Sequence, residues 1–273
     1  MKKINRRSFL AAAGLTAAAL ALTACGGSAS STASSTASSA ASSEAASTSA
    51  TAELTTVEAG KLTMATNAAF PPYEMTTDAG EFEGIDIDTA KAIAEKLGLE
   101  LQIDDMDFDA ALLSVQQGKA DIVMAGVTVT DERKAVMDFS DSYATGIQSI
   151  IVPEGSDITS PDDLAGKKIG TQRGTTGYIY CSDDFGDDAV VAYDDGLTAV
   201  QALKNGQVDA VVIDNAPAKE FVAANPGLVI LDTSYAEEDY AIGLAKGSAL
   251  EDAVNAALEE LKADGTLQSI VDK

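Results

Sequence analysis

Apolar and polar positions follow two different periods from Leu62 onward, and together they predict an α/β body. The stretch KLTMAT at 61–66 is typical of a strand. The next stretch, DIDTAKAIAEKLG at 86–98, has apolar residues at helical spacing and ends in Gly98, a favoured helix terminator. An alternating strand, LELQI, is predicted at 99–103, and a second helix and strand are predicted within 108–126.

One unit of this pattern occurs twice in the chain. AVQALKNGQVDAVVID at 199–214 repeats the order of helix, glycine and buried strand, with Gly206 matching Gly118 and Asp209 matching Asp121. Two copies about 90 residues apart predict two comparable α/β lobes.

The strand ends of the two copies carry opposite charges. Open α/β sheets bind ligands beyond the carboxyl ends of their strands. The first copy ends at Gly126 and leads to Thr128 and Arg133, whereas the second ends at Asp214. If these ends face one another, a cation and an anion converge on one cleft. That pair suits a free amino acid, whose carboxylate fits an arginine fork and whose ammonium fits an aspartate.

A glycine-rich turn adds a candidate anion site. GTQRGTTGY at 170–178 follows a predicted strand and precedes a predicted helix, so its backbone N–H groups and the hydroxyls of Thr175 and Thr176 suit an anion. Simpler interpretations stay open for all these residues. Arg133 is close in sequence to Asp131, Asp138 and Asp141 and could form a surface ion pair. The other candidates could be helix caps or core residues, namely Asp214, Thr175, Thr176 and Phe70.

The first 58 residues predict an export signal and a tether. Residues 1–24 begin with Lys2, Lys3, Arg6 and Arg7 and continue into an apolar run too short to span a membrane, so we interpret them as a signal peptide. LTAC at 22–25 resembles a lipobox, which predicts lipidation of Cys25, and RRSFL also resembles a twin-arginine signal. Residues 25–58 are mostly Ser, Ala and Thr, which predicts a disordered tether.

Composition excludes several classes of function. The chain has no histidine and two cysteines, which removes histidine-based catalysis, histidine metal sites and a disulfide framework. A formal charge of −25 argues against nucleic acid as a partner. We expect no metal and no cofactor.

Several blocks resemble one family. They are ATNAAFPPYE, GIDIDTAKAIAEKLG, MDFDAAL, GKADIVMAGVTVTDERKAVMDFSDSY, DLAGKKIGTQRGTTGY, VDAVVIDNAPA and ALEELKADGTLQSIVDK. In this order they resemble the extracellular solute-binding proteins of polar amino acid ABC transporters, over about 59–272. The resemblance implies the two-lobed α/β type II periplasmic-binding-protein fold, with two crossover connections and a ligand cleft. It implies that 59–144 plus 238–273 form lobe 1 and 145–237 form lobe 2.

The resemblance also implies residue roles. Arg133 would hold the ligand carboxylate with Thr128 and Thr176, and Asp214 would take the ammonium. Backbone and aromatic contacts would come from Gly126, Phe70 and Phe108. The side-chain end would face Asn67 and Gln172. Because these two amides are neutral, they argue against a cationic ligand and favour a neutral polar or sulfur-containing one, although the neighbouring Arg173 could instead attract an acidic side chain.

The function implied is that of the substrate-binding component of an amino acid ABC importer. It would act as a monomer, lipid-anchored at the outer face of the cytoplasmic membrane, and would deliver a free amino acid to separate permease and ATPase subunits. Two alternatives stay open. One is a dehydratase of the same fold acting on a cyclic amino-acid precursor, with Glu74 as its acid. The other is an extracellular ligand sensor whose output passes through a separate partner.

Overall fold

A computed structural model describes residues 54–273, which belong to one compact unit. The predicted signal peptide, Cys25 and most of the predicted tether lie outside the described residues. The last residues of the predicted tether already contact the body. Leu54 packs against the first core, and the Val57 N–H donates to the Asp121 carboxylate at 2.8 Å. Residues 54 and 57 of the predicted tether are thus in contact with the folded body. Within 54–273, no helix is both long enough and apolar enough to cross a membrane.

The first sheet combines parallel strands from the early chain with one strand from its C-terminal part. Its strands are β1 (Lys61–Thr66), β5 (Glu100–Asp105), β6 (Ile122–Val123), β7 (Met137–Phe139) and β14 (Gly243–Ala245). They lie in the order β5–β1–β6–β14–β7, and β14 runs antiparallel to both of its neighbours. The associated helices are α1 (Ile85–Leu97), α2 (Phe108–Gln116), α3 (Asp131–Lys134), α7 (Glu251–Ala263) and α8 (Thr266–Val271).

Alternating side chains of β1 supply two cores, one on each face of this sheet. Leu62 and Met64 pack with α1 and α7, whereas Ala65 packs with α2. A small antiparallel sheet lies between β1 and α1 in sequence. It consists of β2 (Ala69–Phe70), β3 (Glu74–Thr76) and β4 (Phe82–Glu83).

The second sheet is built from the middle of the chain. Its strands are β8 (Ala144–Pro153), β9 (Ile169–Gln172), β10 (Val190–Tyr193), β11 (Ala210–Asp214), β12 (Leu228–Ile230) and β13 (Ala236–Tyr240). Five lie in the order β10–β9–β11–β8–β12, and β13 also pairs with β8. Its helices are α4 (Thr176–Phe185), α5 (Gly196–Lys204), α6 (Asn215–Ala224) and the short 3₁₀ turns η1 (Pro161–Leu164) and η2 (Asp187–Ala189).

The predicted repeat has the same local structure in both places. Gly118 and Gly206 follow α2 and α5 with φ of 66° and 68°, the left-handed conformation that glycine adopts without a steric penalty. Asp121 then accepts from the Thr63 N–H at 2.8 Å, and Asp209 accepts from the Lys168 N–H at 2.7 Å. Each aspartate thus ties its own segment to the strand beside it.

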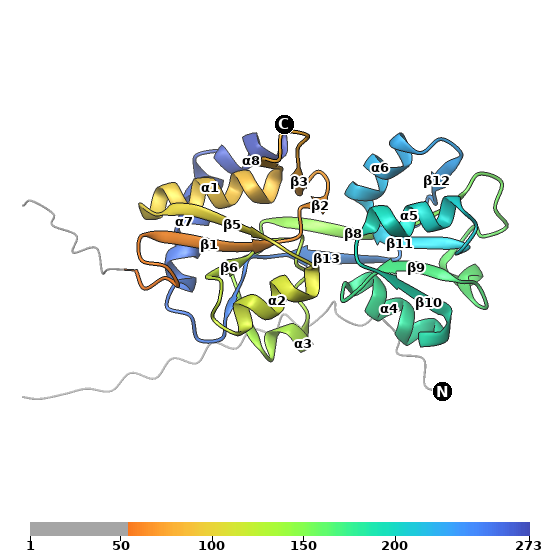
Figure 1. Cartoon of the computed structure of the whole chain (residues 1–273), viewed down its shortest axis with the longest axis horizontal. Helices are drawn as coiled ribbons and strands as arrows, with labels where there is room; N and C mark the ends of the chain where they lie inside the picture. The colour runs from red at the N-terminus through yellow and green to blue at the C-terminus, as the bar shows by residue number, and fades with distance from the viewer. Residues whose placement is uncertain (1–53) are drawn as a thin grey trace, which may run out of the picture. The chain divides into compact units, whose positions relative to one another are not determined.

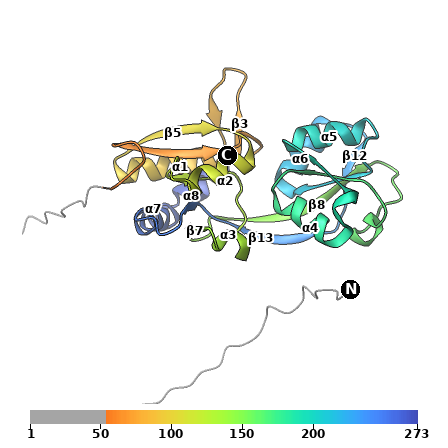
Figure 2. The same ribbon diagram turned by 60° about the horizontal axis from the view of Figure 1, so that its bottom comes forward.

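Two strands connect the lobes. Residues 144–148 of β8 pair antiparallel with 236–240 of β13, so that Ala144 lies opposite Tyr240. Figures 1 and 2 show the two strands side by side between the two α/β bodies. The fold is therefore two-lobed with two crossovers. The residue limits of the lobes stay a proposal.

Candidate functional site

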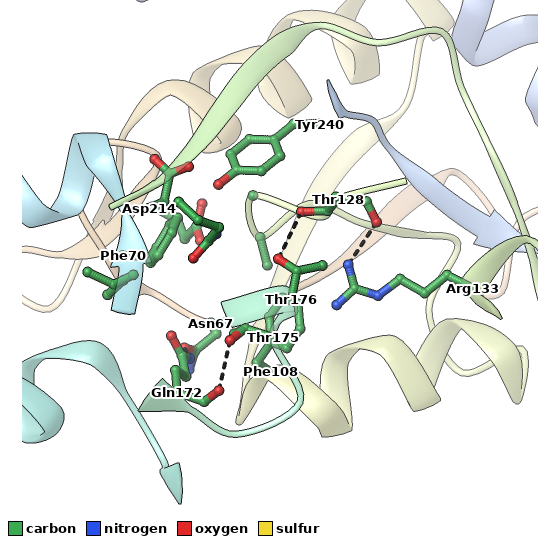
Figure 3. A pocket seen from close by; sticks show the side chains of 15 residues that line it. Asn67, Phe70, Phe108, Thr128, Arg133, Gln172, Thr175, Thr176, Asp214 and Tyr240 are labelled. Carbon is green, nitrogen blue, oxygen red and sulfur yellow. Dashed lines mark hydrogen bonds between the residues drawn. The ribbon is translucent and has the colours of Figure 1, made fainter. Parts of the chain in front are cut away.

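All ten predicted ligand residues line one cleft. Figure 3 shows this cleft from close by. The predicted residues are Asn67, Phe70, Phe108, Gly126, Thr128, Arg133, Gln172, Thr175, Thr176 and Asp214. Five further residues complete the lining, namely Glu74, Ala125, Gln148, Ile213 and Tyr240. The carboxyl ends of strands from both sheets therefore meet at one place, as expected for open α/β sheets.

Arg133 is held from both lobes. Its side chain is only 8 % exposed, and its guanidinium donates to the Thr128 carbonyl at 2.7 Å and to the Gly174 carbonyl at 3.2 Å. The guanidinium carbon lies 5.4 Å from the centre of the Phe108 ring, a cation–π contact. Burial lowers the pKa of Arg133, yet an arginine with so high an ordinary pKa stays charged. Two of its five N–H donors are thus in use, which leaves three for a ligand.

The alternative of a surface ion pair at Arg133 is wrong for Asp138. That carboxylate pairs with Lys246 at 2.6 Å, and the Lys246 hydrogen bond, with a second from the Gly247 N–H, lowers the pKa of Asp138. The predicted attraction of an acidic ligand by Arg173 also finds no support in the geometry. Its side chain is exposed, lies 3.7 Å from Asp194, and does not line the cleft.

Asp214 is both a helix cap and part of the cleft lining. Its carboxylate accepts from the Ala216 N–H at 3.0 Å and from the Ile147 N–H at 2.8 Å, and it faces the Tyr240 hydroxyl (Figure 3). The capping interpretation is therefore confirmed, but a carboxylate has about four acceptor positions, so capping leaves room for a ligand. Burial raises the pKa of Asp214 while these three hydrogen bonds oppose the rise.

The predicted hydroxyls divide into two kinds. The Thr175 hydroxyl caps α4 by accepting from the Tyr178 N–H at 3.4 Å, and it donates to the Gln172 carbonyl at 2.8 Å. It is therefore already engaged within its own turn. The hydroxyls of Thr128 and Thr176 instead lie 3.5 Å apart across the lobes.

A buried acid lies behind this pair of hydroxyls. Glu238 of β13 accepts from the Thr128 hydroxyl and from the Gln148 amide, both at 3.0 Å. Its second oxygen, Oε1, is buried and has no hydrogen bond among the described residues. A connecting strand is thus bonded directly to the region where Arg133 and Thr128 meet.

Gly126 is needed at its position because of its neighbours. A Cβ there would lie 2.9 Å from the Phe70 ring and 3.2 Å from the Tyr240 ring, and φ is 56°. Its N–H donates to the Asp86 carboxylate at 3.0 Å. Phe70 also stacks on Tyr73, with 5.9 Å between ring centres. The aromatic wall and the backbone at Gly126 are therefore in direct contact.

The amides of Asn67 and Gln172 bond to each other across the cleft. The Gln172 Nε2 donates to Asn67 Oδ1 at 2.8 Å and lies 3.4 Å from the Asp194 carbonyl. The Asn67 Nδ2 donates to the Met106 carbonyl at 2.9 Å. Both N–H groups of Gln172 and one of the two N–H groups of Asn67 therefore point at protein oxygens.

A second buried acid on the wall, Glu74, lies beside Asp86. Both side chains are 0 % exposed. Burial, and after it the neighbouring Asp86 carboxylate, raise the pKa of Glu74 well above its ordinary value. Burial raises the pKa of Asp86 to about 6, although hydrogen bonds from the Gly126 N–H, the Tyr143 hydroxyl and Glu74 oppose this rise. Burial is thus the main cause of the raised pKa in both acids.

Sequence reasoning missed several residues of the site. Tyr240 ends β13, and no motif around it in the sequence indicates a place in the cleft. Asp86 left no signal beyond being an acid between two isoleucines, and Glu238 is hidden within the acidic run EED at 237–239. Glu74 was considered as a catalytic acid or base, or as a support for its own loop, and not as part of a ligand cleft. Among residues 54–273 there is no cluster of acidic or cysteine side chains able to hold a metal ion.

The fold and cleft together define a two-lobed binding protein, and comparisons with known proteins give its family. The family model for bacterial extracellular solute-binding proteins, family 3, matches residues 62–273. A probable histidine-binding protein from Neisseria gonorrhoeae is 32 % identical over 99 % of this chain and 96 % of its own length. An L-cystine-binding protein, TcyJ, from Escherichia coli K12 is 33 % identical over 79 % of this chain and 83 % of its own.

A solved structure agrees with these matches. An ancestral arginine-binding protein bound to glutamine is 44 % identical, covers 78 % of this chain and 96 % of its own, and superposes with a TM-score of 0.74. The chain therefore belongs to the bacterial extracellular solute-binding proteins of family 3. Members of this family are substrate-binding proteins and not enzymes, so the dehydratase alternative does not hold.

Proposed function

We propose that this protein captures a free L-amino acid between its lobes and delivers it to an ABC importer. The observation that carries the proposal is the pairing of Arg133 and Asp214. Both are buried and line the same cleft, and in the described chain neither forms an ion pair with a protein group. A ligand with a carboxylate and an ammonium on neighbouring atoms would satisfy both charges at once.

The carboxylate end of the cleft offers several donors. Arg133 supplies charged N–H groups from the first lobe. The N-terminus of α4, a ten-residue helix, supplies backbone N–H groups and the Thr176 hydroxyl from the second lobe. Because a carboxylate held there would contact both lobes, its binding would favour the closed arrangement. Asp214, with Tyr240 beside it, would receive the ammonium, and Gly126 would lie against the ligand's main chain.

The side-chain end favours a ligand that donates hydrogen bonds. Three of the four amide N–H groups of Asn67 and Gln172 donate to protein oxygens, so these amides present mainly acceptor oxygens to the cleft. The preference for a neutral polar or sulfur-containing ligand assumed that this wall holds no acid. Glu74 is an acid on the lining of the same cleft, so the neutral amides alone do not exclude a cationic ligand. We therefore propose a polar side chain with N–H donors, either neutral or cationic.

The names of the relatives fit this chemistry. The solved ancestral protein was bound to glutamine although it is named for arginine. An arginine-binding extracellular protein from Bacillus subtilis is a further relative, at 33 % identity. Glutamine and arginine both end in N–H donors, and they differ in charge and length.

Delivery would require separate permease and ATPase subunits, as in the importers that such proteins serve. We propose that lipid on Cys25 and the Ser, Ala and Thr segment hold the monomeric body near the outer membrane face. An extracellular sensor using the same clamp is the competing outcome. It would bind the same ligand without supporting its uptake.

The proposal is tested by isothermal titration of the full chain, with Cys25→Ala to prevent lipidation, against the twenty L-amino acids. Arg133→Lys keeps the charge but loses the planar fork, so we expect affinity to fall about 10- to 100-fold. Arg173→Lys is the matched control, because this arginine is exposed and outside the cleft, and it should bind as wild type. Circular dichroism melts confirm that each variant folds. If no amino acid binds wild type, or if both variants bind equally, the proposal is wrong.

A second measurement separates cationic from neutral ligands. Burial raises the pKa of Glu74 well above its ordinary value, and a cationic side chain beside it would lower that pKa and favour release of a proton, whereas glutamine would not. Titrations in buffers of different ionisation enthalpy report that proton. Release with arginine and none with glutamine would place the charged group next to Glu74.

A further inference from the structure

The bond between Asn67 and Gln172 joins the two lobes without an intermediary. Asn67 follows β1 of the first sheet, and Gln172 ends β9 of the second. Their side chains are 105 residues apart in sequence, yet they bond at 2.8 Å. Because the contact is direct, it needs no ligand atom between the lobes.

The polarity of this bond is fixed by the surrounding backbone. The Met106 carbonyl can only accept, so the Asn67 atom facing it must be the NH₂ group. Asn67 therefore points its oxygen toward Gln172, and Gln172 must donate to that oxygen through its own NH₂ group. The Asp194 carbonyl on the far side of Gln172 favours the same orientation. Neither amide can be reversed without placing two acceptors against each other.

The bonded pair occupies its own side of the cleft. Figure 3 shows Arg133 on one side, Asp214 on a second, and Asn67 with Gln172 on a third. The proposed carboxylate and ammonium partners thus lie away from the amide pair. A ligand anchored by Arg133 and Asp214 would point its side chain toward the remaining side, where the two amides meet.

We propose that Asn67 and Gln172 form an amide latch, which closes this side of the cleft independently of ligand and selects ligand side chains by length. The length selection rests on the proposed function, whereas the latch itself does not. A side chain that ends before the latch leaves the 2.8 Å bond intact and meets its acceptor oxygens. A longer side chain must break the bond in order for the lobes to close. The free energy of the Asn67–Gln172 hydrogen bond therefore sets how much binding affinity a longer ligand loses.

The latch is tested by measuring the distance between the lobes in the full chain without ligand. Spin labels at Glu95→Cys on α1 and Glu220→Cys on α6 report that distance. Both positions are exposed and belong to different lobes (Figure 1). Cys25→Ala and Cys181→Ala remove the native thiols. Pulsed electron–electron resonance then gives the populations of closed and open forms.

The informative variant is Gln172→Glu. It keeps the size of the side chain but places a carboxylate oxygen against Asn67 Oδ1, so two acceptors face each other. Asn67 cannot relieve this by rotating its NH₂ group toward the carboxylate, because its oxygen would then face the Met106 carbonyl. Losing one ordinary hydrogen bond should lower the closed-to-open ratio about 2- to 12-fold. Gln207→Glu makes the same chemical change on an exposed site of the same lobe and should leave the ratio unchanged. Equal populations in the two variants would overturn the latch, whatever the protein binds.

Length selection is tested with glutamine and citrulline, which both end in a neutral carboxamide-type group but differ in length. Wild type should bind glutamine more tightly than citrulline. Gln172→Ala removes the latch and should lower the ratio of glutamine affinity to citrulline affinity about 2- to 12-fold. Gln207→Ala should leave this ratio unchanged. An unchanged ratio in Gln172→Ala refutes the selection. If wild type binds neither these two nor any other amino acid, the selection falls together with the proposed function, while the distances still decide the latch.

Discussion

The buried carboxyl pair makes a quantitative prediction about stability and pH. Asp86 lies under the Gly126 backbone with its side chain 0 % exposed, and burial raises its pKa from the ordinary 3.8 to about 6. The folded protein therefore holds this proton more strongly than the unfolded chain does between these two values. Stability contributed by the protonated group is complete below pH 3.8, falls as pH rises, and levels off above about pH 6.

The size of the effect follows from the shift. One pKa unit corresponds to about 1.4 kcal/mol, so this rise corresponds to about 3 kcal/mol of unfolding free energy lost by neutral pH. The substitution Asp86→Asn removes the titration. It also weakens the contacts with Gly126 and Tyr143, but that cost is the same at every pH. We expect the variant to gain about 2–3 kcal/mol relative to wild type between pH 4 and pH 7.5.

The assay is urea unfolding followed by circular dichroism, because the chain has no tryptophan. Both proteins are measured at several pH values between 4 and 7.5. Tyr143→Phe provides a second test, since it removes the hydroxyl that bonds Asp86 at 2.7 Å and opposes the rise in pKa. In that variant the loss of stability should continue to a higher pH. A difference between Asp86→Asn and wild type that stays constant across this range would refute a raised pKa at Asp86.

Three further predictions concern other parts of the body. Gly146→Ala would place a methyl group 2.6 Å from an aromatic ring of the cleft wall, so thermal melts should show a loss of about 1–3 kcal/mol and titrations a weaker amino acid affinity. Asp121→Ala leaves two backbone N–H groups without their acceptor at a buried site and should cost about 2 kcal/mol or more in urea unfolding, whereas the exposed Asp209→Ala should cost less. Hydrogen bonds lower the pKa of Asp163, the largest effect coming from the Thr159 backbone N–H and smaller ones from nearby hydroxyls. Asp163→Asn should therefore lower the melting temperature at pH 7, and the difference from wild type should vanish in acid.

Much of the fold could be predicted from local patterns because it depends on neighbours in sequence. The repeat of Gly118 and Asp121 at Gly206 and Asp209 correctly predicted the order of helix, turn and strand beside both sheets. Arg133 and Asp214 were predicted to converge because strand ends in such sheets face one cleft, and the structure places both on its lining.

The residues that sequence reasoning missed all depend on distant contacts. Tyr240 reaches Asp214 from the second connecting strand, and Glu238 reaches Thr128 across 110 positions of the chain. Nothing near either residue indicates such a partner. The chemistry of Asn67 and Gln172 was likewise described as two separate ligand contacts, because their bond to each other exists only once both lobes are in place.

The ladder between β8 and β13 has a mechanical consequence. Five residue pairs, from Ala144 with Tyr240 to Gln148 with Ala236, join the two connections into one ribbon. Two separate linkers would let the lobes slide and rotate in any direction. A two-stranded ribbon bends easily perpendicular to its plane. Sliding one strand past the other would instead break all of the hydrogen bonds between β8 and β13 at once. The paired strands therefore favour bending over sliding as the movement between the lobes.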